Sequence, residues 1–254
     1  MAEFTLTDGQ QNVKQIMHYI AESQVRPMAI QADLDKKYPD SFLLQLQQSG
    51  IHGGAIMDGE KADKKAEEDG AKEGKKKEGQ THRLSTIASE ELAWGDPSLI
   101  LSLPGPGLGG PPVKMMGTEE QKKRFFGPFK NLDEIHFGAY ATTEPGCGSD
   151  VSAISTTARK ENGHYVLNGR KCYITNGAKA DWVVIFATID KSMGRAGQRT
   201  FVVEKGTPGF TVGKIEEKLG LRANETAELV MEDCKVPIEN LLGGEDYYEG
   251  RAKG

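Results

Sequence analysis

The 254-residue sequence predicts an α+β protein, with an N-terminal all-α helical domain at residues 1–133 followed by an antiparallel β-barrel domain at residues 134–245. Before residue 133, apolar residues recur at the spacing of amphipathic helices. After it, short runs rich in Val, Ile, Tyr and Phe alternate with turn signals. Because these runs follow one another without helical segments between them, an antiparallel sandwich or barrel is expected rather than a parallel sheet.

The helical half of the chain is predicted from apolar periodicity and from helix-end signals. Two apolar stripes lie at Val13, Ile16, Met17 and Ile20 and at Leu84, Ile87, Ala88 and Leu92. Pro39 and Gly50 bracket a further helix. Thr118 and Gln121 form a capping box for another, which Gly-Pro at 127–128 ends.

The second half of the chain is predicted to form short strands joined by turns. The expected strands are IHFGAYATT, HYVLNG, KCYITNG, DWVVIFATID, TFVVEKG and ELVMEDCKV. Turn signals lie at Asn-Gly 162–163, 168–169 and 176–177 and at Lys-Gly 205–206. Asn-Gly between such runs is the strongest short-range signal for a hairpin, so these pairs predict hairpin turns.

Composition and charge argue against several classes of protein. A net charge of −5 argues against general binding to nucleic acid or to anionic membranes. No run approaches the ~18 uninterrupted apolar residues of a membrane span. The start, MAEFTLTDGQ, lacks the basic flank and apolar block of a signal peptide. Three cysteines without metal-ligand spacing indicate neither a disulfide framework nor a metal site, so a cytoplasmic location is expected.

Residues 60–80, EKADKKAEEDGAKEGKKKEGQ, carry charges of both signs and no large apolar side chain. Such a segment buries too little surface to offset the entropy of ordering it. Two interpretations are open, an electrostatic docking site and a solvated flexible loop. The nearly balanced charges favour the loop.

Two glycine-bearing stretches could cradle a phosphate. GPGLGG at 105–110 matches G-x-G-x-x-G, but a helical run precedes it and Pro106 removes a backbone donor, so the match is accidental. TEPGCGSD at 143–150 instead follows the predicted strand HFGAYAT. Glycines at a strand exit let successive N–H groups face one anion, and Ser149 adds a hydroxyl. A strand-to-strand turn uses the same residue types, so chemistry alone leaves both interpretations open.

Several ordered blocks resemble the acyl-CoA dehydrogenase family of flavoproteins. The blocks are Tyr140–Asp150 (YATTEPGCGSD), Asn168–Gly177 (NGRKCYITNG), Lys218–Thr226 (KLGLRANET) followed by Val236-Pro237, and the helical segments Glu90–Ala93 and Gly117–Arg124. The similarity runs from about residue 10 to 245, and chance does not produce this order. It implies a helical domain, a middle β-barrel domain and a C-terminal helical domain, of which residues 246–254 are the expected start.

The resemblance implies FAD as the cofactor and implies which residues contact it. By family match these are Tyr140, Thr142, Thr143, Gly148, Ser149, Tyr173, Ile174 and Thr175. The tyrosines and threonines are expected against the isoalloxazine, because reduced flavin gains negative charge that hydrogen-bond donors stabilise. Gly148 and Ser149 are expected at the pyrophosphate. Each assignment has a structural alternative: Tyr173 could be an inward-facing strand aromatic and Thr175 could stabilise a turn.

The resemblance also implies substrate contacts, which are Leu101 and Leu103 at the acyl pocket and Ser149 near the CoA. A plain core helix explains the two leucines equally well. The sequence departs from the family pattern after Ile51, where HGGAIMDGEKADKK replaces a P-E-x-Y-G-G-x-G-like stretch, and Asn224 replaces the usual serine. The family's catalytic glutamate is expected beyond Gly254, so no catalytic residue is assigned and an incomplete chain is the expected explanation.

The leading hypothesis is FAD-dependent α,β-dehydrogenation of an acyl-CoA thioester to the trans-2-enoyl-CoA. The resemblance implies hydride transfer to flavin N5, electron transfer to an electron-transfer flavoprotein, and a homo-oligomer, either a tetramer or a dimer. Two alternatives are an acyl-CoA oxidase and a non-catalytic flavin- or CoA-binding subunit.

Overall fold

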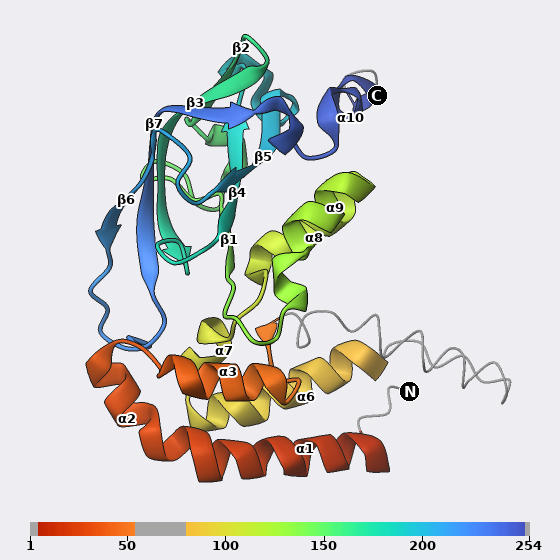
Figure 1. Ribbon diagram of the computed structural model, residues 1–254, viewed down its shortest axis with the longest axis vertical. Helices are drawn as coiled ribbons and strands as arrows, with labels where there is room; N and C mark the ends of the chain where they lie inside the picture. The colour runs from red at the N-terminus through yellow and green to blue at the C-terminus, as the bar shows by residue number, and fades with distance from the viewer. Residues whose placement is uncertain (1–4, 54–79, 252–254) are drawn as a thin grey trace, which may run out of the picture. The chain divides into compact units, whose positions relative to one another are not determined.

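The computed structural model describes residues 5–53 and 80–251 (Figure 1). Contacts divide the chain into two compact units, Met1–Leu103 with Lys218–Asn224 and Pro104–Glu217 with Glu225–Gly254. In this division residues 104–133 belong with the strands. The predicted charged loop at 60–80 lies outside the described residues, apart from Gln80 at the start of a helix.

The described N-terminal part of the first unit is mainly helical, whereas its segment Lys218–Asn224 is irregular. Its helices are α1 (Asp8–Ile20), α2 (Arg26–Asp35), α3 (Asp40–Gln48), α6 (Gln80–Gly95) and α7 (Pro97–Ser102), with a π-helical turn at Ala21–Val25 between α1 and α2. The helix predicted between Pro39 and Gly50 is confirmed as α3. Leu92 and Ile87 are buried as their stripe predicts, whereas Ile16 is 56% exposed, because α1 presents only part of its apolar stripe to α6.

The second unit is built on a seven-stranded sheet. Its strands are β1 (Gly138–Ala141), β2 (Thr157–Glu161), β3 (His164–Thr175), β4 (Trp182–Thr188), β5 (Gln198–Glu204), β6 (Phe210–Ile215) and β7 (Thr226–Pro237). The strand order is β1-β4-β2-β3-β7-β6, with β5 paired to β4. The pairings are antiparallel except those of β1 and β2 with β4, which are parallel. A parallel pair needs a crossover connection, and between β1 and β4 the chain runs through the loop after β1 and the β2–β3 hairpin.

The Asn-Gly pairs differ in what they form. Asn162 and Gly163 have φ values of 42° and 79° and close the predicted hairpin between β2 and β3. The hairpin predicted at 168–169 is wrong, because β3 runs through it as one strand with a register shift against β7. Gly169 is required there for packing, since an added Cβ would lie 2.5 Å from Thr156 Oγ1. Glycine in a strand interior often marks such a bulge or close approach.

Helices α8 (Gly110–Met116), α9 (Glu119–Phe126) and α10 (Gly244–Arg251) complete the second unit. The capping box at Thr118 and Gln121 is confirmed at the start of α9. Val113 of α8 and Phe125 of α9 pack in one apolar cluster with Trp182 of β4, whose indole N–H donates to the Phe125 carbonyl at 3.0 Å. GPGLGG is preceded by α7 rather than by a strand, and a Cβ on Gly109 would lie 2.5 Å from the Ala139 carbonyl oxygen. Its glycines therefore serve close packing.

None of the helices in the described part of the chain combines the length and the apolar character needed to cross a bilayer. The same residues contain no group of three or more side chains that could hold a metal ion.

Candidate functional site

The loop that leaves β1 is closed by its own backbone. The N–H of Glu144 donates to the Cys147 carbonyl at 2.9 Å, and the N–H of Cys147 donates back to Glu144 at 3.1 Å. Beyond this turn, Gly148 and Ser149 are exposed, and among the described residues their N–H groups have no protein acceptor. A Cβ on Gly148 would meet nothing within 4 Å. The loop thus offers two adjacent donors and open space, which suits an anionic group.

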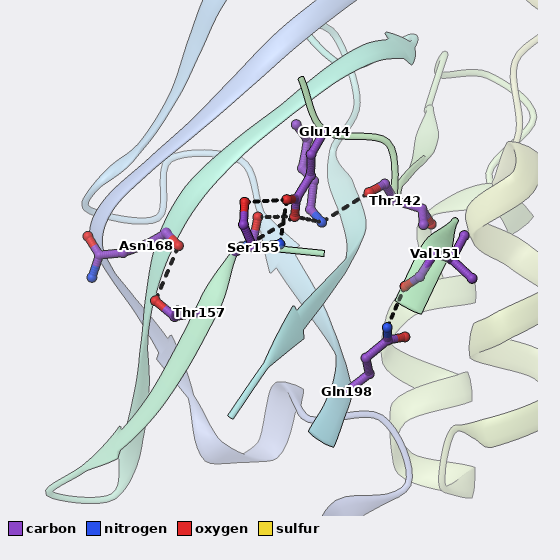
Figure 2. Close-up of polar contacts among 9 residues, drawn as sticks. Thr142, Glu144, Val151, Ser155, Thr157, Asn168 and Gln198 are labelled. Atoms are coloured by element: carbon purple, nitrogen blue, oxygen red, sulfur yellow. Dashed lines mark hydrogen bonds and ion pairs between the residues drawn. The ribbon is translucent and has the colours of Figure 1, made fainter. Parts of the chain in front are cut away.

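A buried carboxylate organises the base of this loop (Figure 2). Glu144 is 3% exposed, and it accepts hydrogen bonds from the N–H and hydroxyl of both Ser155 and Thr156. Lys171 of β3, which is fully buried, adds a fifth donor with Nζ 2.7 Å from Glu144 Oε1. Buried charges are tolerated when they are paired and hydrogen-bonded in this way.

The surroundings of Glu144 fix its protonation state. Burial raises the pKa of its carboxyl, but the hydrogen bonds from Lys171, Ser155 and Thr156 outweigh burial and lower that pKa to about 2. Burial also lowers the pKa of Lys171, and the neighbouring carboxylate opposes this effect. Glu144 is therefore ionised throughout the physiological range.

The same lysine ties the loop to the end of β3. Lys171 Nζ donates to the Thr142 carbonyl at 3.1 Å, and the N–H of Cys172 donates to the Thr143 carbonyl at 3.0 Å. These two bonds place Thr142 and Thr143 beside residues 171–173. The structure thus brings together the two sequence blocks that were predicted to share one ligand.

Tyr173 has an unusual backbone conformation. Its φ is 60°, in the left-handed region, and it lies where the β3–β7 register shifts between Lys171 and Ile174. Its side chain is 66% exposed, so the alternative of an inward-facing core aromatic is wrong. Left-handed backbone at a bulky residue stores strain, and bulges commonly re-aim side chains next to ligand sites.

The turn after Thr175 is held by Glu225, just before β7. The N–H of Asn176 donates to the Glu225 carbonyl at 3.0 Å, and the N–H of Ala178 donates to Glu225 Oε2 at 3.1 Å. Asn176 has a φ of 59°, which asparagine tolerates better than most residues. Thr175 is consequently presented at a fixed corner.

Thr142, at the start of the loop after β1, carries a hydroxyl without a hydrogen-bond partner among the described residues. Within the described part of the chain, Thr142 Oγ1 is buried and makes no hydrogen bond. A buried polar group without a partner costs about 1–3 kcal/mol, and because solvent does not reach this oxygen, it is not available to a bound ligand. The exposed Tyr173 ring and the N–H groups of the exposed residues Gly148 and Ser149 instead suit a ligand with a flat ring and a phosphate tail. The residues present therefore fit a flavin dinucleotide.

The other predicted site residues lie in different surroundings. Tyr140 packs edge-on against Phe186, with 5.3 Å between ring centroids. Ile174 is 2% exposed and packs in the core of the sheet, so only its backbone is available to a ligand. Leu101 and Leu103 belong to the helical unit, where Leu101 is 42% exposed and Leu103 is buried.

The sequence alone predicts no role for four residues of this site, Glu144, Lys171, Ser155 and Thr156. The sequence holds no clear signal for them, because a glutamate in a turn and a lysine in a strand are both ordinary at a protein surface, and only their burial is unusual. The pairing itself depends on a tertiary contact, since Ser155 is 11 residues and Lys171 is 27 residues from Glu144.

A helical unit and a unit built on a predominantly antiparallel sheet, in which a loop and a bulged strand expose a tyrosine and several donors, define a two-domain α+β protein. The N-terminal domain of acyl-CoA dehydrogenases matches residues 7–131, and the middle domain of that family matches residues 139–234. The chain belongs to the acyl-CoA dehydrogenase family.

Relatives and solved structures agree with this assignment. The short-chain-specific acyl-CoA dehydrogenase of Clostridium acetobutylicum is 39% identical over 245 residues, which is 96% of this chain and 60% of that protein. Butyryl-CoA dehydrogenase from Megasphaera elsdenii has a TM-score of 0.76 at 36% identity, covering 96% of this chain and 61% of that one. A glutaryl-CoA dehydrogenase from Mycobacterium smegmatis, solved in complex with FADH2, has a TM-score of 0.71 at 25% identity, covering 96% and 58%. The chain thus spans about 60% of the length of the relatives it matches.

Proposed function

We propose that the protein binds FAD at the corner formed by the Thr142–Ser149 loop and the Tyr173–Thr175 end of β3. One observation carries the proposal: Lys171 and Cys172 hold the Thr142–Thr143 backbone against the strand that exposes Tyr173. The relative solved with FADH2 supports the identity of the ligand.

The residues divide by the part of FAD that they would hold. Thr142, Thr143 and Thr175 would present donors to the polar edge of the isoalloxazine, and Tyr173 would pack on the ring. Gly148 and Ser149 would receive the pyrophosphate with their N–H groups and the serine hydroxyl. Tyr140 and Ile174 would contribute through their backbone, because their side chains pack inside the unit.

The proposed reaction is oxidation of an acyl-CoA to the trans-2-enoyl-CoA. FAD, when bound, supplies the two-electron acceptor for the hydride that leaves the β-carbon. The names of the relatives favour short acyl chains, so butyryl-CoA is the first substrate to assay. Leu101, Leu103 and Ser149 remain proposed substrate contacts. Electron-transfer flavoprotein is the proposed acceptor, and a homo-oligomer is the proposed assembly.

Glu144 is not the base that removes the α-proton. A general base works best when its pKa lies near the working pH, and the five donors around Glu144 lower its pKa to about 2. The carboxylate is buried beneath the loop rather than directed to a ligand. Its part in the site is structural and electrostatic.

The test is to purify the protein, remove bound flavin, and titrate it with FAD. We expect the protein to bind one FAD per chain and to turn yellow. We also expect the bound flavin to bleach when butyryl-CoA is added anaerobically. Fast reoxidation of the bleached flavin in air would favour an oxidase. Flavin uptake without bleaching by any acyl-CoA would favour a non-catalytic binding subunit, and absence of uptake would refute the proposal.

A further inference from the structure

The Glu144–Lys171 pair is the most completely buried ion pair among the described residues. The Glu144 side chain is 1% exposed and the Lys171 side chain is fully buried. Replacing a buried pair by apolar residues is often neutral or stabilising, so a contribution to folding is a weak explanation for such a pair. Its contacts point to another role.

Each partner is connected to a different part of the site. The Glu144 carboxylate accepts hydrogen bonds from the N–H groups of Ser155 and Thr156, and these bonds fix the segment that leads into β2. Lys171 donates to the Thr142 carbonyl and lies two residues before Tyr173 in β3. The pair therefore links the backbone of Thr142 and Thr143 to the strand that exposes Tyr173.

The pair also sets the charge beneath this corner. With both groups ionised, their net charge is zero. Loss of Lys171 would leave a buried carboxylate that Ser155 and Thr156 still hold in its ionised form, whereas loss of Glu144 would remove the main group that keeps the buried Lys171 amine protonated, so that amine would become neutral. Buried charges are poorly screened, so loss of Lys171 alters the electrostatic potential at neighbouring ligand atoms.

We propose that Glu144 and Lys171 form a positioning pair that holds the Thr142–Thr143 backbone in place and, by balancing charge beneath it, sets the reduction potential of the bound flavin. The inference rests on the proposed flavin site. Because reduced flavin carries more negative charge than oxidised flavin, an unbalanced negative charge lowers the potential and an unbalanced positive charge raises it.

The experiment measures the two-electron potential and the FAD dissociation constant of the intact protein and its variants. Lys171→Met is expected to weaken the relative affinity for reduced flavin by roughly tenfold, which lowers the potential by about 30 mV. Glu144→Gln is expected to leave the potential near the wild-type value, because the buried amine loses its proton together with its counter-ion. The double variant is expected to return toward the wild-type potential. Lys171→Arg, which keeps the charge, is expected to keep the potential.

Arg170→Met is the matched control. It removes one positive charge from the residue next to Lys171 in β3, but the Arg170 side chain is 56% exposed and pairs with Glu228 at 3.1 Å. Solvent screens this charge, so the potential should stay at the wild-type value.

A lowered potential for Lys171→Met with a near wild-type potential for Glu144→Gln supports the inference, because a merely structural role would loosen the site and shift the potential in both variants. Shifts in the same direction, or a shift for Arg170→Met equal to that for Lys171→Met, would overturn it. If Glu144→Gln does not fold, the inference is tested by comparing the potentials of Lys171→Met and Lys171→Arg. Equal potentials for these two variants overturn the inference. Wild-type protein that takes up no FAD would instead refute the proposed function, and the inference with it.

Discussion

Replacing Tyr173 by glycine should separate folding from cofactor binding. Tyr173 combines a left-handed backbone with a side chain that is 66% exposed. A residue chosen for stability alone would have neither feature. The substitution Tyr173→Gly removes the side chain and, in the same step, relieves the backbone.

Two opposing terms determine its effect on stability. About a third of the residue is buried, so its loss exposes roughly 70 Å² and costs ~1.5–2 kcal/mol. Glycine adopts the left-handed conformation without the penalty of ~1–2 kcal/mol that a residue with a Cβ incurs. The terms nearly cancel, so the free energy of unfolding of the flavin-free protein should change by no more than about 1 kcal/mol. FAD affinity should fall by about tenfold, because loss of a ring contact removes ~1.4 kcal/mol.

Urea unfolding of the flavin-free protein and fluorescence titration with FAD measure the two quantities. Asn162→Gly is the control, because Asn162 is also left-handed and lies just before the opposite end of β3, at the hairpin turn. This variant should leave FAD affinity unchanged. A loss of 3 kcal/mol or more for Tyr173→Gly, or wild-type FAD affinity, would refute the argument that Tyr173 serves the ligand.

Three further outcomes follow from the same unit. The ordinary pKa of a glutamate is 4.5, and in the folded protein that of Glu144 is about 2. The free energy of unfolding should therefore be unaffected by this group above pH 4.5 and should fall by about 3 kcal/mol as the pH drops toward 2. The Glu144→Gln variant should lack this loss in the same acid titration. In urea unfolding of the flavin-free protein, Thr142→Val should raise the free energy of unfolding by ~1 kcal/mol, because it removes a buried hydroxyl that makes no hydrogen bond to any described residue. Thr156→Val should lower it, because that hydroxyl donates to Glu144. An equal loss of stability in the two variants would show that the Thr142 hydroxyl has a partner. Gly169→Ala should lower the melting temperature markedly, because its Cβ would lie 2.5 Å from Thr156 Oγ1, while Gly163→Ala at the open hairpin tip should cost only the strain of its left-handed backbone.

Local signals predicted the elements that depend on local chemistry. The capping box at Thr118 and Gln121 and the hairpin at Asn162-Gly163 are confirmed, because each is set by residues within one turn of one another. The helix between Pro39 and Gly50 is confirmed because each of its two end signals acts locally. Asn168-Gly169 has the same two residue types as the hairpin turn at Asn162-Gly163, but it lies within β3. There, the close approach of Thr156 decided the conformation.

For the candidate site, the sequence identified the two segments but not what holds them together. Resemblance identified YATTEPGCGSD and KCYITNG as one site, and Lys171 and Cys172 do join them. Burial decided which side chains are available, since Tyr173 is exposed and Ile174 is not, although both lie in the same block. The individual FAD contacts stay predictions.

The sequence by itself determined the class of each half and the family, because apolar periodicity, helix caps and the order of the motifs can be read from the order of residues in the chain. Only the tertiary structure decided that a glutamate in a glycine-rich turn and a lysine in a strand neutralise one another in a buried position. The physical reason is that the energy of a charge depends on its distance to partners and on its exposure to water, and neither quantity is fixed until the loop folds onto β3.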